Sequence, residues 1–194
     1  MNFTEESSTL LSSLPVTLIE ARILVVMGVS SSGKSVTGKA IARRLHAPFL
    51  DGDGYHPEAN KDKMRAGIPL VDADRWPWLS TLGKALHEAA ESKGVAVGAC
   101  SALKRSYRDY LLAEAGEPVL FVFLDGSQEL IASRMATRHH EYMPQALLAS
   151  QFETLERPAA DENVLTLPVT LPVETITERV IKAVPHLKAF KRKQ

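Results

Sequence analysis

The chain has few of the features that mark secreted, membrane-spanning or nucleic-acid-binding proteins. Cys100 is the only cysteine among 194 residues, which excludes an internal disulfide and fits a reducing compartment, so we expect a cytoplasmic protein. Lysine plus arginine and aspartate plus glutamate both number 23, so no net field attracts nucleic acid or an anionic membrane. No apolar run approaches the roughly 20 residues that span a bilayer. We therefore expect no nucleic-acid partner and no membrane partner.

The length suits one domain with a hydrophobic core of its own. Residues 1–20 are rich in Ser and Thr and lack the basic start and apolar centre of a secretory signal, so they are predicted to form a flexible N-terminal extension. Residues 186–194 are basic and are predicted to form a solvated tail. The domain is thus predicted to span residues 21–185.

Five short apolar runs alternate with longer segments of helical periodicity. Such alternation predicts an α/β fold with a five-stranded parallel sheet covered by helices on both faces. Leu79, Leu82, Leu86 and Ala90 recur on one helical face, as expected for a core stripe. Ligands bind such sheets beyond the carboxyl ends of the strands, and polar residues follow four of the five runs. The runs are residues 23–27, 48–50, 95–100, 119–124 and 164–167.

The first run is followed by a phosphate-binding loop of the form GxxxxGK[ST], and a helical pattern follows the loop. Consecutive backbone N–H groups in such a loop wrap around phosphate oxygens, and the helix N-terminus adds partial positive charge. Lys34 is expected to contact the outer phosphates of ATP and Ser35 to bind Mg²⁺. A functionless turn is the alternative, but the strand and helix on either side argue against it. The predicted ATP-binding residues are Gly28, Val29, Ser30, Ser31, Ser32, Gly33, Lys34 and Ser35.

Two carboxylates, Asp51 and Asp53, end the second run, where they are expected to lie beside the phosphate loop. One acid at such a place can organise Mg²⁺, and another can accept the proton of an attacking hydroxyl. Asp53 lies farther beyond the strand and is predicted to be the catalytic acid. Asp51 is predicted to orient the metal-bound water. Turn formation around Gly52 is the alternative for both.

The segment from Asp51 to Leu79 and the stretch after the third run are dense in polar and cationic side chains. His and Asp can exchange hydrogen bonds with hydroxyl groups, and Lys or Arg can bind a carboxylate, so a polyhydroxylated acid is the expected substrate. Lys104 and Arg108 lie one helical turn apart, and a solvated basic face is the alternative for them. Trp76 and Trp78 are expected to pack. The predicted substrate-binding residues are Asp53, His56, Lys63, Arg75, Ser101, Lys104 and Arg108.

These motifs resemble the gluconokinase family of P-loop sugar-acid kinases, relatives of shikimate kinase. The resemblance covers roughly residues 23–184. It implies a P-loop kinase fold with a mobile lid, and transfer of the γ-phosphoryl group of ATP to the 6-hydroxyl of D-gluconate. It also suggests a homodimer. The motifs that carry it are the phosphate loop, Asp51-Gly52-Asp53 with His56-Pro57, Asn60 and Lys63-Met64, its continuation in residues 67–70 and 72–79, the run from Cys100 to Asp109, and the run from Ser150 to Glu156.

The stretch from Arg138 to Pro144 loses periodicity and is predicted to be an exposed loop. By resemblance this loop is the lid, Arg138 contacts the transferring phosphoryl group and counts as catalytic, and Arg134 packs near adenine. Water is itself an acceptor hydroxyl, so closure of such a lid limits ATP hydrolysis. A helix-surface role is the alternative for Arg134.

Three positions depart from the family pattern. Ser31 stands where glycine is usual, residues 139–142 replace a shorter lid tip, and the fifth strand lacks the usual acidic residue. Because of the first departure, the family pattern does not predict the backbone dihedrals of the phosphate loop. Because of the second, it does not predict the contacts of the lid. Two other functions remain as alternatives, a kinase for another small hydroxy acid and a catalytically silent nucleotide-binding module.

Overall fold

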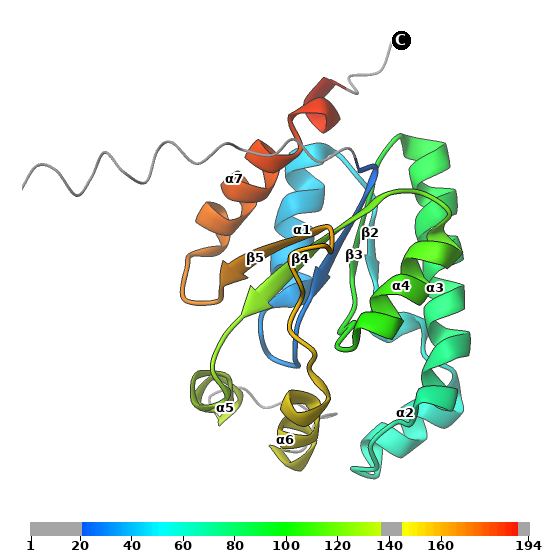
Figure 1. Cartoon of the computed structure of the whole chain (residues 1–194), viewed down its shortest axis with the longest axis vertical. Helices are drawn as coiled ribbons and strands as arrows, with labels where there is room; N and C mark the ends of the chain where they lie inside the picture. Colours follow the sequence, from blue (N-terminus) through cyan, green and yellow to red (C-terminus); the bar gives the residue numbers. More distant parts are fainter. Residues whose placement is uncertain (1–20, 137–144, 190–194) are drawn as a thin grey trace, which may run out of the picture.

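The computed structural model describes residues 21–136 and 145–189 and contains one parallel five-stranded sheet in the order β2-β3-β1-β4-β5 (Figure 1). The helices lie on both sides of the sheet, which confirms the predicted α/β fold. The observed strands begin and end within one residue of the predicted runs. They are β1 (Ile23–Met27), β2 (Phe49–Asp51), β3 (Ala96–Ala99), β4 (Val119–Asp125) and β5 (Val164–Pro168).

The central strands are apolar on both faces because each face is covered by its own core cluster. Along β1, Leu24 and Val26 belong to one cluster, whereas Ile23, Val25 and Met27 belong to the other. Successive side chains of a strand point to opposite faces, so an uninterrupted apolar run is what a doubly covered strand requires.

Four helices form the two covering layers. On one side, α1 (Lys34–Leu45) packs against α7 (Val173–Ala183), and on the other, α3 (Asp72–Lys93) packs against α4 (Arg105–Ala115). The apolar stripe predicted within residues 79–90 is buried on α3. The remaining helical elements are η1 (Gly52–Tyr55), α2 (Glu58–Arg65), α5 (Gln128–Ala136), α6 (Gln145–Thr154) and η2 (Pro185–Ala189).

The packed region continues past the predicted domain boundary at residue 185. Leu187, in η2, is buried in the core cluster of α1 and α7, and His186 Nε2 lies 3.1 Å from the carbonyl oxygen of Ala21. The tail prediction was therefore too long by at least these two residues. The predicted extension, the predicted lid loop and Arg138 lie outside the described residues. No helix in residues 21–136 and 145–189 is long and apolar enough to cross a membrane.

Candidate functional site

The phosphate loop follows β1 with a backbone that few side chains would permit. Gly28 has φ of 138°, and a Cβ there would lie 3.0 Å from the carbonyl oxygen of Leu124. Ser31, which stands where the family pattern has glycine, adopts φ of 62°. It therefore takes the left-handed conformation that glycine adopts more readily, at some energetic cost.

The loop has the donors that a phosphate group needs. Gly33 precedes α1 in a left-handed conformation, and no side chain caps the N-terminus of the helix. Among the described residues, the buried hydroxyls of Ser31 and Ser32 have no hydrogen-bond partner. Open helix N-terminal amides and unsatisfied hydroxyls around one concave loop fit a bound anion, so the observed loop suits ATP phosphates.

Lys34 brings a cation to the same loop. Its Nζ donates a 2.8 Å hydrogen bond to the carbonyl oxygen of Val29, which folds the side chain back over the loop. Burial lowers the pKa of Lys34, whereas the carboxylate of Asp53 acts in the opposite direction. The ammonium is thus held in a poorly hydrated position, where an anionic partner interacts with it more strongly than in water.

The acid pair lies at the carboxyl end of β2, as its place after the second apolar run predicted. Asp51 Oδ1 accepts a 3.3 Å hydrogen bond from the Asp53 backbone N–H, so the two acids have different surroundings. Gly52 between them is buried, and a Cβ there would collide with the carbonyl oxygen of Ala99. Burial raises the pKa of Asp53, Asp51 adds to the effect and Lys34 opposes it.

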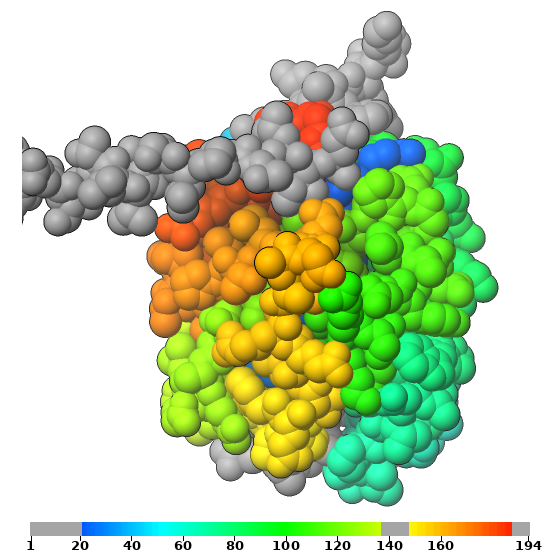
Figure 2. All heavy atoms as spheres, viewed as in Figure 1, coloured from blue at the N-terminus to red at the C-terminus, as the bar shows by residue number. Residues whose placement is uncertain are grey.

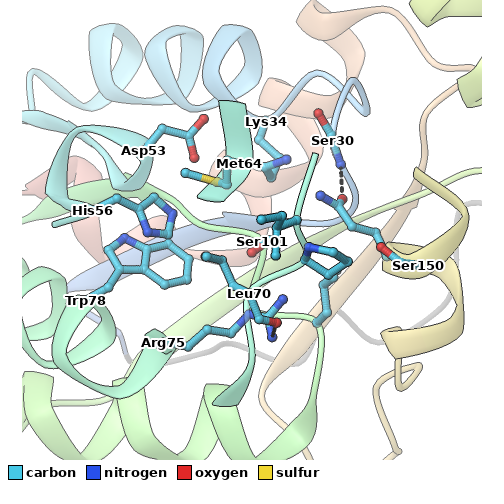
Figure 3. Close-up of a pocket in the computed structure, with 14 residues that line it drawn as sticks. Ser30, Lys34, Asp53, His56, Met64, Leu70, Arg75, Trp78, Ser101 and Ser150 are labelled. Atoms are coloured by element: carbon cyan, nitrogen blue, oxygen red, sulfur yellow. Dashed lines mark hydrogen bonds between the residues drawn. The ribbon is translucent and has the colours of Figure 1, made fainter. Parts of the chain in front are cut away.

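A pocket joins the phosphate loop and this acid to the elements that follow (Figure 3). It encloses about 650 Å³ of empty space, its open mouth included. In Figure 2, α6 and α2, whose residues lie on opposite walls of the pocket, are separated by a narrow gap. Its polar lining comprises Ser30, Lys34, Asp53, His56, Arg75, Ser101, Ser150 and Gln151, and its apolar lining comprises Met64, Ile68, Pro69, Leu70, Trp78 and Leu103.

His56 is buried on the acceptor side of this pocket. Its ring stacks on Trp78 with the centroids 3.9 Å apart, and Trp78 Nε1 donates a 2.7 Å bond to the Gly52 carbonyl. Burial, with smaller effects from Arg75 and Lys61, lowers the pKa of His56 to about 4. The imidazole is therefore neutral at physiological pH. The predicted packing role of Trp78 is confirmed, and its packing partner is a predicted substrate-binding residue.

Arg75 is the second cation that lines the pocket. Its Nη1 donates to the Leu70 carbonyl at 2.7 Å and to the Tyr107 hydroxyl at 3.1 Å. Within the described residues, its Nε and Nη2 make no hydrogen bond, and the side chain is 16% exposed. Tyr107 in turn donates a 2.6 Å bond to Asp72. The guanidinium is thus anchored at one nitrogen and can bind a carboxylate with the others.

Two predicted substrate cations lie away from the pocket lining. Lys63 contacts both carboxylate oxygens of Asp74, at 2.7 and 2.9 Å, and Lys104 contacts both oxygens of Asp72, at 2.9 and 3.0 Å. The paired Lys lowers the pKa of Asp74, and hydrogen bonds from Tyr107 and then Lys104 lower that of Asp72. Both lysines therefore have carboxylate partners within the protein and tie α2 and α4 to the start of α3.

Arg108 corrects a third prediction. It was expected to face the cleft one turn from Lys104, but it is 1% exposed and bonds Glu162 at 2.5 and 2.9 Å. Its Nη1 also donates to the carbonyl oxygens of Ala102, Leu103 and Glu156. Arg108 thus uses its hydrogen bonds within the protein, and it supports the turn after β3 from behind the pocket.

Arg108 belongs to an ionic cluster that we call the clamp, formed by Arg105 and Arg108 of α4 with Glu156, Asp161 and Glu162 of the segment between α6 and β5. Arg105 bonds Asp161 at 3.1 and 2.8 Å, and Glu156 Oε2 accepts a 2.7 Å bond from the Arg105 backbone N–H. The clamp fixes the end of α6 beside the turn at residues 101–103. Arg105 and Arg108 therefore serve mainly to hold an acidic segment, whereas Lys104 binds Asp72 of α3.

Gln151 is a pocket residue to which sequence reasoning assigned no role. Its Oε1 accepts a 2.7 Å hydrogen bond from the Ser30 backbone N–H, marked by the dashed line in Figure 3. An amide of the phosphate loop is thus occupied by a side chain of α6. The only sequence signal was the run from Ser150 to Glu156, which belonged to the family resemblance.

Arg134 lies near the opposite edge of the sheet. Its Nη2 donates a 2.8 Å bond to the carbonyl of Val169, which follows β5, and it does not line the described pocket. Its expected position near adenine stays a prediction. The same holds for the catalytic role of Arg138, which lies outside the described residues.

Comparison with known proteins agrees with this fold. A family model described as shikimate kinase matches residues 30–166. The chain is 44% identical over 161 residues to the thermosensitive gluconokinase of Escherichia coli (strain K12), an alignment that covers 82% of this chain and 86% of that protein. Among solved structures, a gluconokinase from Sinorhizobium meliloti 1021 matches with a TM-score of 0.76 and 44% identity, covering 88% of this chain and 95% of that one. A sugar kinase from Janibacter sp. HTCC2649 matches with a TM-score of 0.82 and 39% identity, covering 88% and 98%.

Proposed function

This chain belongs to the gluconokinase family, within the shikimate kinase family of P-loop kinases, and we propose that it transfers the γ-phosphoryl group of ATP to the 6-hydroxyl of D-gluconate. The products are ADP and 6-phospho-D-gluconate. One observation carries the choice of substrate: a phosphate-loop lysine, a carboxylate, a neutral imidazole and an incompletely bonded guanidinium line one pocket. That set matches a transferring phosphate, an attacking hydroxyl, further hydroxyls and a substrate carboxylate.

The residues divide the work of the reaction between two sides. On the phosphate side, the amides of the loop and Lys34 hold the triphosphate and stabilise charge on the transferring group. On the acceptor side, Asp53 orients the 6-hydroxyl and accepts its proton as the new O–P bond forms and the bond to the ADP oxygen breaks. The transition state of such transfers is loose, so orientation contributes as much as proton removal.

Ser35 and Asp51 are the residues we assign to Mg²⁺. No cluster of three or more His, Cys, Asp or Glu side chains suited to a metal occurs in the part of the chain that the structure describes. Mg²⁺ in kinases is held by one or two protein ligands together with phosphates and water, so one hydroxyl and one carboxylate suffice. When bound, the ion supplies positive charge to the phosphate oxygens.

Arg75 is our choice for the substrate carboxylate. Its guanidinium lines the pocket with two nitrogens unbonded among the described residues, and only its Nη1 approaches a carboxylate, that of Asp72, at 4.0 Å. By contrast, Lys63, Lys104 and Arg108 each bond a carboxylate directly. A guanidinium binds a carboxylate through two parallel hydrogen bonds, which an aldehyde sugar cannot reproduce. The apolar wall of Met64, Ile68 and Leu70 can pack against the C–H groups of the sugar chain.

The direct test is ADP release by the full chain with ATP and Mg²⁺ in the presence of D-gluconate, other aldonates, shikimate or glucose. We expect gluconate to be preferred and ³¹P NMR to show a phosphate ester at its 6-position. The Arg75→Met variant should raise KM for gluconate by roughly tenfold to a hundredfold and leave KM for ATP nearly unchanged. Preference for another aldonate would mean that the substrate is a sugar acid other than gluconate. No acceptor-dependent ADP release from any of them would support the silent nucleotide-binding module.

A further inference from the structure

His56 is held by a different neighbour on each side. One ring face stacks on Trp78, which is itself fixed to the carbonyl of Gly52. Its Nδ1 lies 3.4 Å from Asn60 Nδ2. The ring also lines the pocket, where Figure 3 shows it beside Trp78 on the side of Asp53 and Met64. Since Nδ1 is turned toward Asn60, Nε2 is the ring nitrogen left for the pocket.

The orientation of the Asn60 side chain follows from its second contact. Asn60 is 4% exposed and lies on α2, and its Nδ2 donates a 2.8 Å hydrogen bond to the backbone carbonyl of Asp74. A carbonyl can only accept, so the atom facing it must be the amide nitrogen and not the amide oxygen. The same nitrogen has a second hydrogen, and that hydrogen is available for His56 Nδ1.

We propose that Asn60 is a positioning residue that fixes the tautomer of His56, with Nδ1 as acceptor and the proton on Nε2, so that the pocket receives a neutral N–H donor aimed at a substrate hydroxyl oxygen. A neutral imidazole has one donor and one acceptor nitrogen. Because the Asn60 amide donates to Nδ1, Nδ1 must be the acceptor and Nε2 carries the proton. Asn60 does not line the pocket and acts only through His56.

The charges around the ring support the neutral form. Burial, Arg75 and Lys61 all lower the pKa of His56, to about 4. A neutral donor beside the acceptor Asp53 makes a pair that matches the two hydrogen-bonding capacities of hydroxyl groups. The carboxylate of the substrate is left to Arg75. The part of this inference that concerns the substrate rests on the proposed function, whereas the tautomer does not.

The decisive measurement is ¹⁵N–¹H NMR of the histidine rings in the full chain, labelled at histidine and assigned with the His56→Gln variant. At neutral pH we expect the His56 ring to carry its proton on Nε2 alone. A ring protonated on Nδ1, or on both nitrogens, would overturn the proposal. This result does not depend on which acceptor the enzyme uses.

Two substitutions separate tautomer control from structural support, because both lose the bond to the Asp74 carbonyl. Asn60→Asp offers Nδ1 an acceptor, so the proton should move to Nδ1, and the apparent KM for gluconate should rise by roughly tenfold to a hundredfold. Asn60→Ala imposes no tautomer and should give a several-fold smaller increase. KM for ATP should change little in either variant.

Asn163→Asp is the matched control, since Asn163 Nδ2 also donates a 2.8 Å bond to a backbone carbonyl, that of Val119, at the other end of the strands. It should leave both KM values unchanged. Equal kinetic defects in Asn60→Asp and Asn60→Ala, with His56 keeping its Nε2 proton in both, would reduce Asn60 to a structural residue and overturn the proposal. An enzyme inactive on gluconate but with the expected tautomers would instead refute the proposed function.

Discussion

The pocket and the clamp both contain arginines close to helix N-termini, yet their charges are balanced differently. In the clamp, Arg108 bonds Glu162 and three backbone carbonyls, so each of its three guanidinium nitrogens donates to a protein acceptor. In the pocket, Arg75 is anchored through Nη1 alone, and within the described residues its other nitrogens make no hydrogen bond. The difference separates a cation that holds the fold from one that can bind a ligand.

The same contrast appears in the acids. Hydrogen bonds from Arg108 lower the pKa of Glu162, whereas burial raises the pKa of Asp53. A lowered pKa means that the fold favours the carboxylate, and a raised one means that the fold disfavours it. Substitutions in the pocket should therefore cost activity and little stability, and substitutions in the clamp should do the reverse.

The largest expected effect on activity is that of Lys34→Ala in the pocket. Loss of this cation should lower turnover by roughly a thousandfold or more, because it stabilises charge on the transferring phosphoryl group. The melting temperature should change by only a few degrees, since the fold gains little from a poorly hydrated ammonium. Steady-state kinetics and calorimetry of one preparation check both statements. Near-normal turnover would refute the phosphate-loop assignment.

Arg108→Met is the corresponding test of the clamp. This substitution leaves the buried Glu162 carboxylate without its cationic partner and should lower the free energy of unfolding by about 3 to 5 kcal/mol. The folded variant should keep its KM values within about tenfold of those of the wild type. Any change in KM should come from a shift of the turn at residues 101–103, which the clamp supports. Denaturant unfolding and kinetics at low temperature measure the two effects.

Arg105→Met is the control for the clamp. Arg105 forms a similar two-bond pair with Asp161, but both side chains are largely exposed, at 47% and 64%. Water and salt screen such a pair, so its loss should change stability far less than Arg108→Met. Adding Glu162→Gln to Arg108→Met should recover part of the loss. Equal destabilisation by the two arginine substitutions would show that burial is not what distinguishes them.

Asp53→Asn tests the other side of the comparison. Loss of the acceptor carboxylate should lower turnover by about a hundredfold or more and leave ATP binding nearly unchanged. Because the fold disfavours the ionised form, the asparagine should leave stability at neutral pH equal or slightly higher. The folded-state pKa is raised, so any stabilisation by protonated Asp53 is present below the ordinary pKa of 3.8 and is lost as pH rises through the raised value.

Activity has the opposite dependence on this proton, since the carboxylate is the active form. Turnover of the wild type should fall on acidification at a pH above 3.8, and the limb due to Asp53 should be missing from the residual activity of Asp53→Asn. Asp51→Asn should instead raise the Mg²⁺ requirement. If the two variants exchange these defects, the assignment of the two acids is reversed.

The sheet could be predicted from the sequence because apolar runs and helical stripes repeat with simple periods. The phosphate loop and Asp53 could be predicted too, since a strand end places them whatever the side chains around them do. The positions of Lys63, Lys104 and Arg108 could not. Which of several cations keeps nitrogens without a hydrogen bond depends on where Asp72, Asp74 and Glu162 lie in the fold, and helical spacing contains no information about that.

The role of Gln151 could not be predicted from the sequence either, because its contact joins α6 to a loop 121 residues away in the chain. In the structure its side-chain oxygen takes the Ser30 N–H, a donor that lies within the phosphate loop. If a phosphate oxygen is to use that N–H, the glutamine has to leave it, and the lost hydrogen bond weakens nucleotide binding. A typical net hydrogen bond is worth about 0.5 to 1.5 kcal/mol.

Gln151→Ala should therefore tighten binding of a non-hydrolysable ATP analogue by about twofold to tenfold, a gain from removing a polar pocket residue. Titration calorimetry of the full chain measures it. Gln128→Ala, at an exposed position of α5, is the control and should bind like the wild type. Weaker binding by Gln151→Ala would mean that the glutamine contacts the bound nucleotide and does not compete with it. In that case α6 contributes directly to the pocket in the nucleotide complex, and the clamp that fixes its far end supports binding as well as folding.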